Sequence, residues 1–197
     1  MSARSIHVKI PLERIGVLIG SEGRVKEAIE KNLGLEIKVD SSTGDVSFTG
    51  SGPDPSLLFQ ARDMVLAIAR GFSPEKAFKL LNEDLNICVI DLREIFETPS
   101  DVQRVKSRII GKNGKTRRIL EEETMTSISV YGHTVSIIGD IEHLEVAREA
   151  VEMFIRGALH STVYRYLDRK RSDLKQIEME LWKSTPEELN KGRKKHV

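Results

Sequence analysis

The chain is poor in cysteine and aromatic residues, and it has no long apolar run. Among its 197 residues there is one Cys, and aromatic residues make up 5%. A single cysteine cannot form an internal disulfide, so Cys88 is expected to be a reduced core residue. No apolar segment typical of a signal peptide opens the sequence, and no stretch approaches the roughly 20 apolar residues of a membrane helix. We therefore expect a cytoplasmic protein that does not contact a membrane.

An excess of charge of one sign is also missing. The sequence has 31 Lys and Arg against 30 Asp and Glu, for a formal net charge of +1. Net charge therefore does not indicate a nucleic-acid-binding protein, and only the distribution of the charges can do so. With 39% hydrophobic residues, the chain has enough apolar side chains for two small cores.

No pattern of catalytic or metal-binding residues is present. The five histidines lack the spacing of metal ligands, and Cys88 has no evident base nearby in the sequence. The acidic run Glu121–Glu123 is expected to be a solvated helix end, because charge runs usually face water. We predict a protein that is not an enzyme and that requires no metal or cofactor.

The sequence contains an internal repeat. The segment Arg14–Arg24 returns as Val105–Lys115, and each copy has an apolar turn, a Gly-x-x-Gly motif and a basic residue. The match continues beyond the glycines, with offsets that change only between periodic segments, where loops absorb deletions. The matched pairs are Gly20 with Gly111, Gly23 with Gly114, Ile37 with Ile128, Val39 with Val130, and Ala61–Gly71 with Ala147–Gly157.

Hydrophobic periodicity predicts the order β-α-α-β-β-α in each copy. In the second copy we expect a strand region over Leu85–Ile95 and a helix over Val102–Ile110. Ser73 and Pro74 are typical of a helix start, which predicts a linking helix over Pro74–Leu81. The predicted protein is α+β, with a first domain at 1–72, a helical linker at 73–83, a second domain at 84–158 and a helical basic tail at 159–197.

The segment Gly111–Thr116 has three possible interpretations. A nucleotide-binding P-loop fails, because Ile109 stands where the motif requires glycine and because the preceding segment is predicted to be helical. A structural turn explains one Gly-x-x-Gly motif, since glycine is the usual turn residue, but it explains two copies in matched surroundings poorly. The third interpretation is the KH domain, in which such a loop clamps about four backbone nucleotides.

Both copies resemble the KH family over nearly their full length. The resemblance implies two tandem type I KH domains, each with a three-stranded antiparallel sheet backed by three helices, and single-stranded RNA as the ligand. In such a site the loop amides and nearby cations bind phosphates, and unpaired bases lie in an adjacent apolar groove. The expected RNA-binding residues of the second copy are Arg108, Ile109, Ile110, Gly111, Lys112, Asn113, Gly114, Lys115, Arg117, Arg118 and Ile128. Those of the first copy are Ile19, Gly20, Ser21, Glu22, Gly23, Arg24 and Lys26.

The two copies differ in charge. The segment Val102–Leu120 has seven basic residues and no acidic residue, whereas Leu12–Glu30 has three basic and four acidic residues. Glu22 also lies inside the first loop, where it would repel a phosphate. We therefore expect the second copy to supply most of the affinity for RNA.

The whole chain is similar to the archaeal relatives of the eukaryotic small-subunit assembly factor Partner of Nob. The resemblance rests on Gly71–Ala77, Arg108–Thr116, His133–Gly139 and the tail from Gly157. It implies binding to small-subunit ribosomal RNA near its 3′ end and cooperation with the nuclease that matures this end. It also implies contact with the alpha subunit of initiation factor two.

Two alternatives remain open at this point. The chain could belong to another RNA pathway, linked to the exosome or to translation. It could instead be a scaffold whose KH grooves bind proteins, with an apolar stripe in the tail (Leu167, Leu174, Ile177 and Leu181) as the docking element. Only the RNA-binding protein should show affinity that falls steeply with salt.

Overall fold

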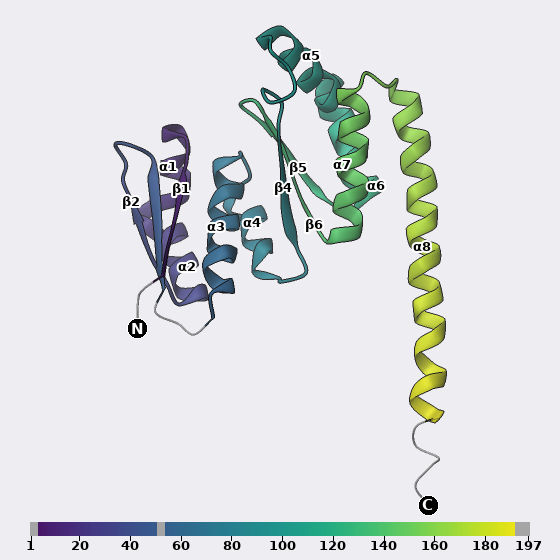
Figure 1. Ribbon diagram of the computed structural model, residues 1–197, viewed down its shortest axis with the longest axis horizontal. Coiled ribbons are helices and arrows are strands. Elements are labelled where there is room, and N and C mark those ends of the chain that lie inside the picture. Colours follow the sequence, from purple (N-terminus) through teal and green to yellow (C-terminus); the bar gives the residue numbers. More distant parts are fainter. Residues whose placement is uncertain (1–3, 51–53, 192–197) are drawn as a thin grey trace, which may run out of the picture.

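The computed structural model describes residues 4–50 and 54–191 and shows a mixed α+β protein (Figure 1). Its first half contains β1 (Arg4–Lys9), α1 (Leu12–Ile19), the 3₁₀ turn η1 (Ser21–Gly23), α2 (Arg24–Leu33), β2 (Glu36–Val39), β3 (Asp45–Gly50) and α3 (Ser56–Ala69). After α4 (Pro74–Ala77) and η2 (Phe78–Leu81), the second half contains β4 (Asn86–Asp91), α5 (Pro99–Ile110), η3 (Lys112–Gly114), α6 (Lys115–Thr124), β5 (Ser127–Tyr131), β6 (Thr134–Gly139), α7 (Ile141–Ile155) and α8 (His160–Lys191).

Each half forms its own three-stranded antiparallel sheet. The strand orders are β1-β3-β2 and β4-β6-β5, so the last strand of each half is central and the middle strand lies at an edge. The register also repeats: Ile37 pairs with Phe48 in the first sheet, and Ile128 pairs with Ile137 in the second. The predicted β-α-α-β-β-α order is therefore present twice.

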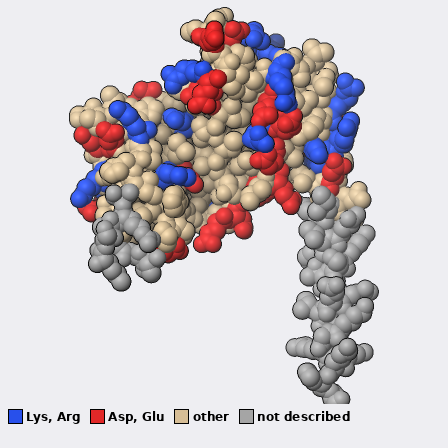
Figure 2. Space-filling view, viewed as in Figure 1, with Lys and Arg blue, Asp and Glu red and all other residues tan. Residues whose placement is uncertain are grey.

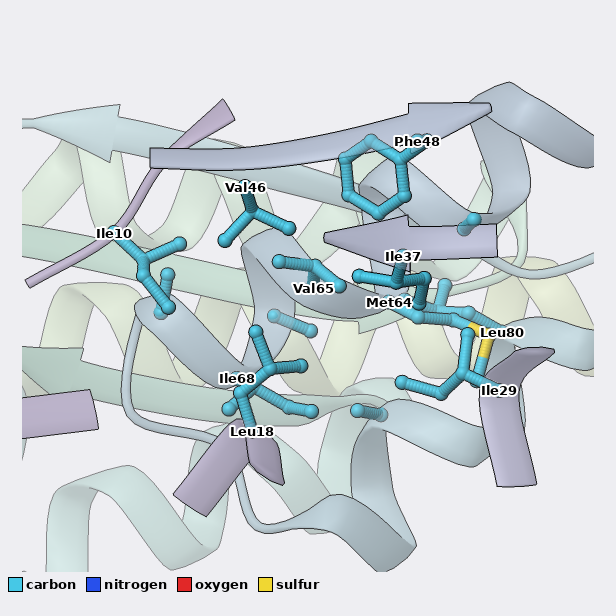
Figure 3. Packing of buried hydrophobic residues seen from close by; sticks show 14 of the residues in the cluster. Ile10, Leu18, Ile29, Ile37, Val46, Phe48, Met64, Val65, Ile68 and Leu80 are labelled. Atoms are coloured by element: carbon cyan, nitrogen blue, oxygen red, sulfur yellow. The ribbon is translucent and has the colours of Figure 1, made fainter. Parts of the chain in front are cut away.

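The first hydrophobic core lies between the first sheet and the helices α1, α2 and α3 (Figure 3). Leu18, Ile29, Phe48 and Ile68 are fully buried there. Along β3, buried residues alternate with partly exposed ones, because successive side chains of a strand point to opposite faces. One face of this sheet therefore packs on helices, while the other carries polar side chains.

The second sheet is covered on both faces. Cys88 and Ile90 of β4 pack against the second core, formed with the helices of that half, whereas Ile87 and Ile138 pack against the first core. Figure 1 shows α3 and α4 between the two sheets. Every residue of β6 is buried as a result. The two halves are thus packed together through the outer face of the second sheet.

The segment that links the halves is part of the first core. The predicted helix over Pro74–Leu81 is present as α4 followed by η2. Ala77 and Leu80 are buried in the first core, with exposures of 0% and 3%. The Gln60 side chain donates a hydrogen bond to the carbonyl of Leu80 at 2.9 Å. This segment therefore packs as a structural element instead of acting as a free spacer.

Two predicted boundaries in the second half were wrong. The strand region expected over Leu85–Ile95 contains β4, which ends at Asp91, because the chain turns where Leu92 is fully buried. The helix expected from Val102 begins at Pro99 instead. Thr98 explains the earlier start, since its side-chain oxygen accepts a hydrogen bond from the amide of Asp101 at 3.1 Å and caps the helix.

The tail is one long helix that runs past the body of the protein (Figure 1). Val163 and Leu167 bury its first turns against the second core, and Leu174 packs there in part. The Ile177 and Leu181 side chains, which belong to the predicted apolar stripe, lie outside the described residues. The described part of the stripe therefore covers the protein's own surface. No helix in the described ranges is long and apolar enough to cross a membrane.

Candidate nucleic-acid interface

The two Gly-x-x-Gly loops have nearly the same backbone conformation. Gly20 has φ 74° and ψ 177°, and Gly111 has φ 70° and ψ 178°. The third residue of each loop has positive φ, at 55° for Glu22 and 53° for Asn113. The repeat therefore extends from sequence to backbone geometry. Asn adopts this left-handed region readily, whereas it is less common for Glu.

Close packing against the following helix requires the first glycine of each loop. A Cβ at Gly111 would lie 2.2 Å from Thr116 Oγ1, and a Cβ at Gly20 would lie 2.5 Å from Val25 Cγ2. Their combination of φ and ψ is also one that essentially only glycine adopts. Each loop is thus held tightly on the first turn of the next helix, with its remaining residues turned to solvent.

The second loop presents cations that the protein does not neutralise. Lys112, Asn113 and Lys115 are exposed, and neither lysine has an ion-pair partner among the described residues. Arg118 donates a hydrogen bond to the carbonyl of Asn113 at 3.0 Å, which supports the loop from α6. The loop borders a shallow depression lined by Lys112, Asn113, Lys115, Arg118, Ile119 and Glu122.

The cations of the first loop are paired with acids. Arg24 contacts Glu22 at 2.7 Å, and Lys26 contacts Glu30 at 3.1 Å. Ser21 is exposed and adds no charge. Figure 2 shows basic and acidic side chains interspersed over the visible face, so charge differences are local. The predicted difference in charge between the copies is therefore present at the loops themselves.

Arg108, predicted to bind RNA, also makes contacts within the protein. Its guanidinium donates hydrogen bonds to the carbonyls of Phe154 and Ala158 at the end of α7. It also lies 5.9 Å from the centroid of the Phe154 ring. A cation is favourable at a helix C-terminus, where carbonyls lack intrahelical partners. Arg108 thus ties α5 to α7, a role that local sequence does not reveal because its partners lie about 50 residues away.

Two of the predicted groove isoleucines are core residues. Ile109 and Ile128 have exposures of 0% and 2%, so their side chains support the surface from beneath and do not line it. Ile19 and Ile110, which precede the two loops, are only partly buried. Both offer partly exposed apolar surface beside the loops. Arg117 lies partly buried, with its Nε 3.6 Å from a carboxylate oxygen of Glu121.

Sequence reasoning missed Glu121 and assigned it to a solvated helix end. Its side chain is 17% exposed and accepts a hydrogen bond from the amide of Ile128 at 2.8 Å. It also contacts Lys76 at 3.1 Å. The repeat could have indicated this role, because Glu30 and Ile37 occupy the equivalent positions in the first copy and form the same hydrogen bond.

Within the described ranges, no three His, Cys, Asp or Glu residues come together as a metal site. The His143 ring contacts Asp140, which also accepts a hydrogen bond from the His143 amide and so caps α7.

The single cysteine is not an activated nucleophile. Burial raises the pKa of the Cys88 thiol, which keeps the thiol protonated and weakly nucleophilic at neutral pH.

Comparison with known proteins identifies related KH-domain proteins. Residues 86–172 match the family model of a eukaryotic type KH domain, KH-domain type I, of the second domain of PNO1. A KH domain-containing protein of Methanocaldococcus jannaschii is 45% identical over 91% of this chain and 80% of its own length. The pre-rRNA-processing protein PNO1 of Eremothecium gossypii is 29% identical over 89% of this chain and 68% of its own.

A solved structure provides a further match. It is the Dim2p of Pyrococcus horikoshii in a complex with a/eIF2alpha and rRNA, and it has 47% sequence identity and a TM-score of 0.82. The alignment covers 87% of this chain and 96% of that one. Sequence and fold agree with these relatives over most of the chain, which therefore belongs to the PNO1/Dim2 family of KH-domain proteins.

Proposed function

We propose that this protein binds single-stranded RNA through the loop Gly111–Gly114 and acts in assembly of the small ribosomal subunit. The observation that carries the proposal is a pair of unneutralised cations, Lys112 in the loop and Lys115 directly after it, beside a backbone that two glycines shape for close contact. No reaction is assigned to the site, because binding and positioning of RNA require none.

Different parts of the site have different roles in RNA recognition. The lysines and loop amides bind phosphates, which sets the position of the strand but reads no bases. Beside the loop, Ile110 offers apolar surface, and β5 is an edge strand whose outer backbone groups face away from β6. Bases lying there would contact apolar atoms and hydrogen-bond at their edges. A duplex does not expose its bases in this way, which favours a single strand.

We infer that both halves are type I KH domains, at 1–72 and 84–158, joined by the segment 73–83 and followed by the tail 159–197. Two observations support this division: each half has a three-stranded sheet of the same order, and each has its own loop of the same conformation. The charges at the first loop favour a supporting role in RNA binding, because Glu22 offsets Arg24.

The relatives suggest the pathway. One is named as a pre-rRNA-processing protein, and a solved relative forms a complex with a/eIF2alpha and rRNA. By analogy, we propose that this chain binds small-subunit rRNA near its 3′ end in the cytoplasm. The rRNA 3′-end nuclease and the alpha subunit of initiation factor two are its proposed protein partners.

Paired loop variants test the RNA site. We expect replacement of Lys112 and Asn113 by Asp to weaken binding of an unstructured RNA more than tenfold. Replacement of Ser21 and Glu22 by Asp should change it less than threefold. Affinity of the unaltered protein should fall steeply with salt, by about 0.7 log units per log unit of salt for each phosphate bound. Equal losses in the two variants would refute the asymmetry, and salt-independent binding would favour a scaffold.

The pathway needs a separate experiment. Crosslinking of the full chain in cell extract, followed by mapping of the RNA positions, should give sites concentrated in small-subunit rRNA near its 3′ end. Crosslinks spread over unrelated transcripts would contradict the proposed pathway while leaving RNA binding intact.

A further inference from the structure

The tail helix α8 contacts both of the helices that frame the second Gly-x-x-Gly loop. The chain enters this loop from α5 and leaves it through α6. On the entry side, Nε2 of His160 lies 3.1 Å from the backbone carbonyl oxygen of Arg108, in the last turn of α5. On the exit side, the hydroxyl of Tyr164 lies 3.2 Å from that of Thr116, in the first turn of α6. The start of α8 therefore holds the loop at both of its ends.

The contact at the end of α5 satisfies a carbonyl that the helix itself leaves open. The last four carbonyls of an α-helix have no intrahelical amide partner, and Arg108 lies in the last turn of α5. A carbonyl oxygen only accepts, so His160 donates this hydrogen bond from Nε2. The imidazole lies beside the rings of Phe154 and Tyr164, with centroid separations of 4.9 and 6.1 Å. His160 thus caps the helix that leads into the loop.

Thr116 connects Tyr164 to the backbone of the loop. The Thr116 side chain packs directly on Gly111, because a Cβ there would lie 2.2 Å from Thr116 Oγ1. The same hydroxyl is the hydrogen-bond partner of Tyr164, and Thr116 is 4% exposed. Displacement of this hydroxyl would disturb the packing that holds Gly111 in its unusual conformation. The position of α8 is therefore coupled to the first residue of the loop through one pair of hydroxyls.

The first copy differs at each of these points. Val25 stands in the position of Thr116 and has no hydroxyl. The residues three and seven positions after the glycine that follows the last helix, where the second copy has its two tail residues, are Pro74 and Phe78. Neither side chain has a hydrogen-bonding group. Among the described residues, the connection from a following helix to the loop is thus specific to the copy whose loop cations are unneutralised.

Stability alone does not account for the polar pair. Two hydroxyls that bond each other add little to stability compared with two apolar groups of the same shape. We therefore propose that His160 and Tyr164 are positioning residues, through which docking of α8 sets the conformation of the second Gly-x-x-Gly loop and thereby its affinity for RNA. This inference rests on the proposed function and adds a dependence of RNA binding on the tail. Coupling is reciprocal, so RNA at the loop should in turn favour docking of α8.

The pair of hydroxyls allows a test by small changes in the full chain. Tyr164→Phe and Thr116→Val each remove one hydroxyl and keep the shape of the side chain. Each should weaken binding of a short unstructured RNA by roughly fivefold, which corresponds to one neutral hydrogen bond. The two changes together should weaken binding no more than either alone, because they remove the same interaction. Thr116→Ser keeps the hydroxyl and should bind within about twofold of the unaltered protein.

Tyr166→Phe is the matched control. Tyr166 lies on the same helix and is also partly buried, but its hydroxyl has no hydrogen-bond partner among the described residues. This variant should bind RNA like the unaltered protein. Equal affinities of the Tyr164 and Tyr166 variants, or additive losses in the double variant, would overturn the positioning role and leave the proposed function standing. Failure of the unaltered protein to bind RNA would overturn both.

His160→Phe tests the other end of the loop. It keeps an aromatic ring beside Phe154 but leaves the Arg108 carbonyl without its donor. Affinity for RNA should fall by roughly fivefold, and this loss should add to that of Tyr164→Phe because the two contacts are separate. An unchanged affinity would overturn the role assigned to His160.

NMR separates positioning from a role in stability. In the unbound Tyr164→Phe protein, the amide signals of Gly111–Gly114 should shift at a temperature at which every variant is folded. A role in stability alone would lower the unfolding midpoint and leave these signals in place. In the unaltered protein, RNA should slow amide exchange in the first turns of α8 more than in α3. Unchanged exchange in α8 would contradict the coupling even if the variants proved unstable.

Discussion

The carboxylate of Glu121 accepts a hydrogen bond from the backbone amide of Ile128, with 2.8 Å between Oε1 and N. In the first half, Glu30 forms the same hydrogen bond with the amide of Ile37 at 2.7 Å. Each bond joins the helix that follows a Gly-x-x-Gly loop to the edge strand of its sheet. Only Glu121 also contacts Lys76, on the segment between the halves. The two contacts of Glu121 thus fix the second loop relative to β5 and connect α6 to the first half.

Replacement of Glu121 by Ala should destabilise the fold. The change leaves the Ile128 amide without its acceptor and removes the partner of Lys76, which together should cost about 2 kcal/mol of unfolding free energy. Glu121→Gln should cost less, because the amide oxygen still accepts. Urea unfolding measures both. Glu122→Ala, at the exposed neighbour, is the control and should change stability by less than about 0.5 kcal/mol. Equal effects at the two positions would contradict the assigned role.

Gly71 and Gly157 provide a test of the contact between the halves. They occupy matching positions after α3 and α7, with φ of 92° and 91°. A Cβ at Gly157 would meet open space, whereas one at Gly71 would lie 2.7 Å from the Tyr131 Cβ. Gly157→Ala should therefore cost about 1–2 kcal/mol for the left-handed backbone alone. Gly71→Ala should cost at least 1 kcal/mol more in thermal or urea unfolding. Equal losses would indicate that the halves do not pack tightly there.

The cap of α5 supports the start of the helix that leads to the second loop. The Thr98 side chain accepts from the amide of Asp101 and donates to its carboxylate. Thr98→Ala should cost about 1 kcal/mol of unfolding free energy, as for other N-caps. Ser100→Ala, at an exposed position in the first turn, serves as the control. Amide hydrogen exchange of the first turn should accelerate in the Thr98 variant, and an unaltered exchange rate would count against the cap.

The pH dependence of stability should report on His133. Burial, with help from the cations around it, lowers the pKa of this group in the folded protein below its ordinary value of 6.5. Below pH 6.5 the unfolded chain therefore binds the proton first, so stability falls as the pH is lowered until the folded pKa is reached. Above that window the group contributes no slope. Urea unfolding between about pH 5 and pH 8 should show a shallower decline in His133→Asn than in the unaltered protein. Parallel profiles would contradict the prediction.

Periodicity was sufficient to predict most of the elements, because burial of one helix face or one strand face leaves a regular apolar pattern. The two loops could be predicted from the repeated Gly-x-x-Gly motif, because Gly20 and Gly111 adopt a conformation that other residues avoid. The contacts that the sequence did not reveal are those of side chains with distant partners. Arg108 bonds to the end of α7, and Glu121 bonds to β5 and to Lys76, and no local pattern records such contacts.

The sequence by itself determined the order of elements, the duplication and the backbone of both loops, because these depend on local sterics and on apolar periodicity. It also specified different outer faces for the two sheets: His7 and Ser47 are polar, whereas Ile87 and Ile138 are apolar. Only the tertiary structure decided that α3 and α4 cover the apolar face and that Arg70, Arg93 and Lys106 meet around His133. Those outcomes depend on residues from separate elements packing together, and distance along the chain does not determine distance in space.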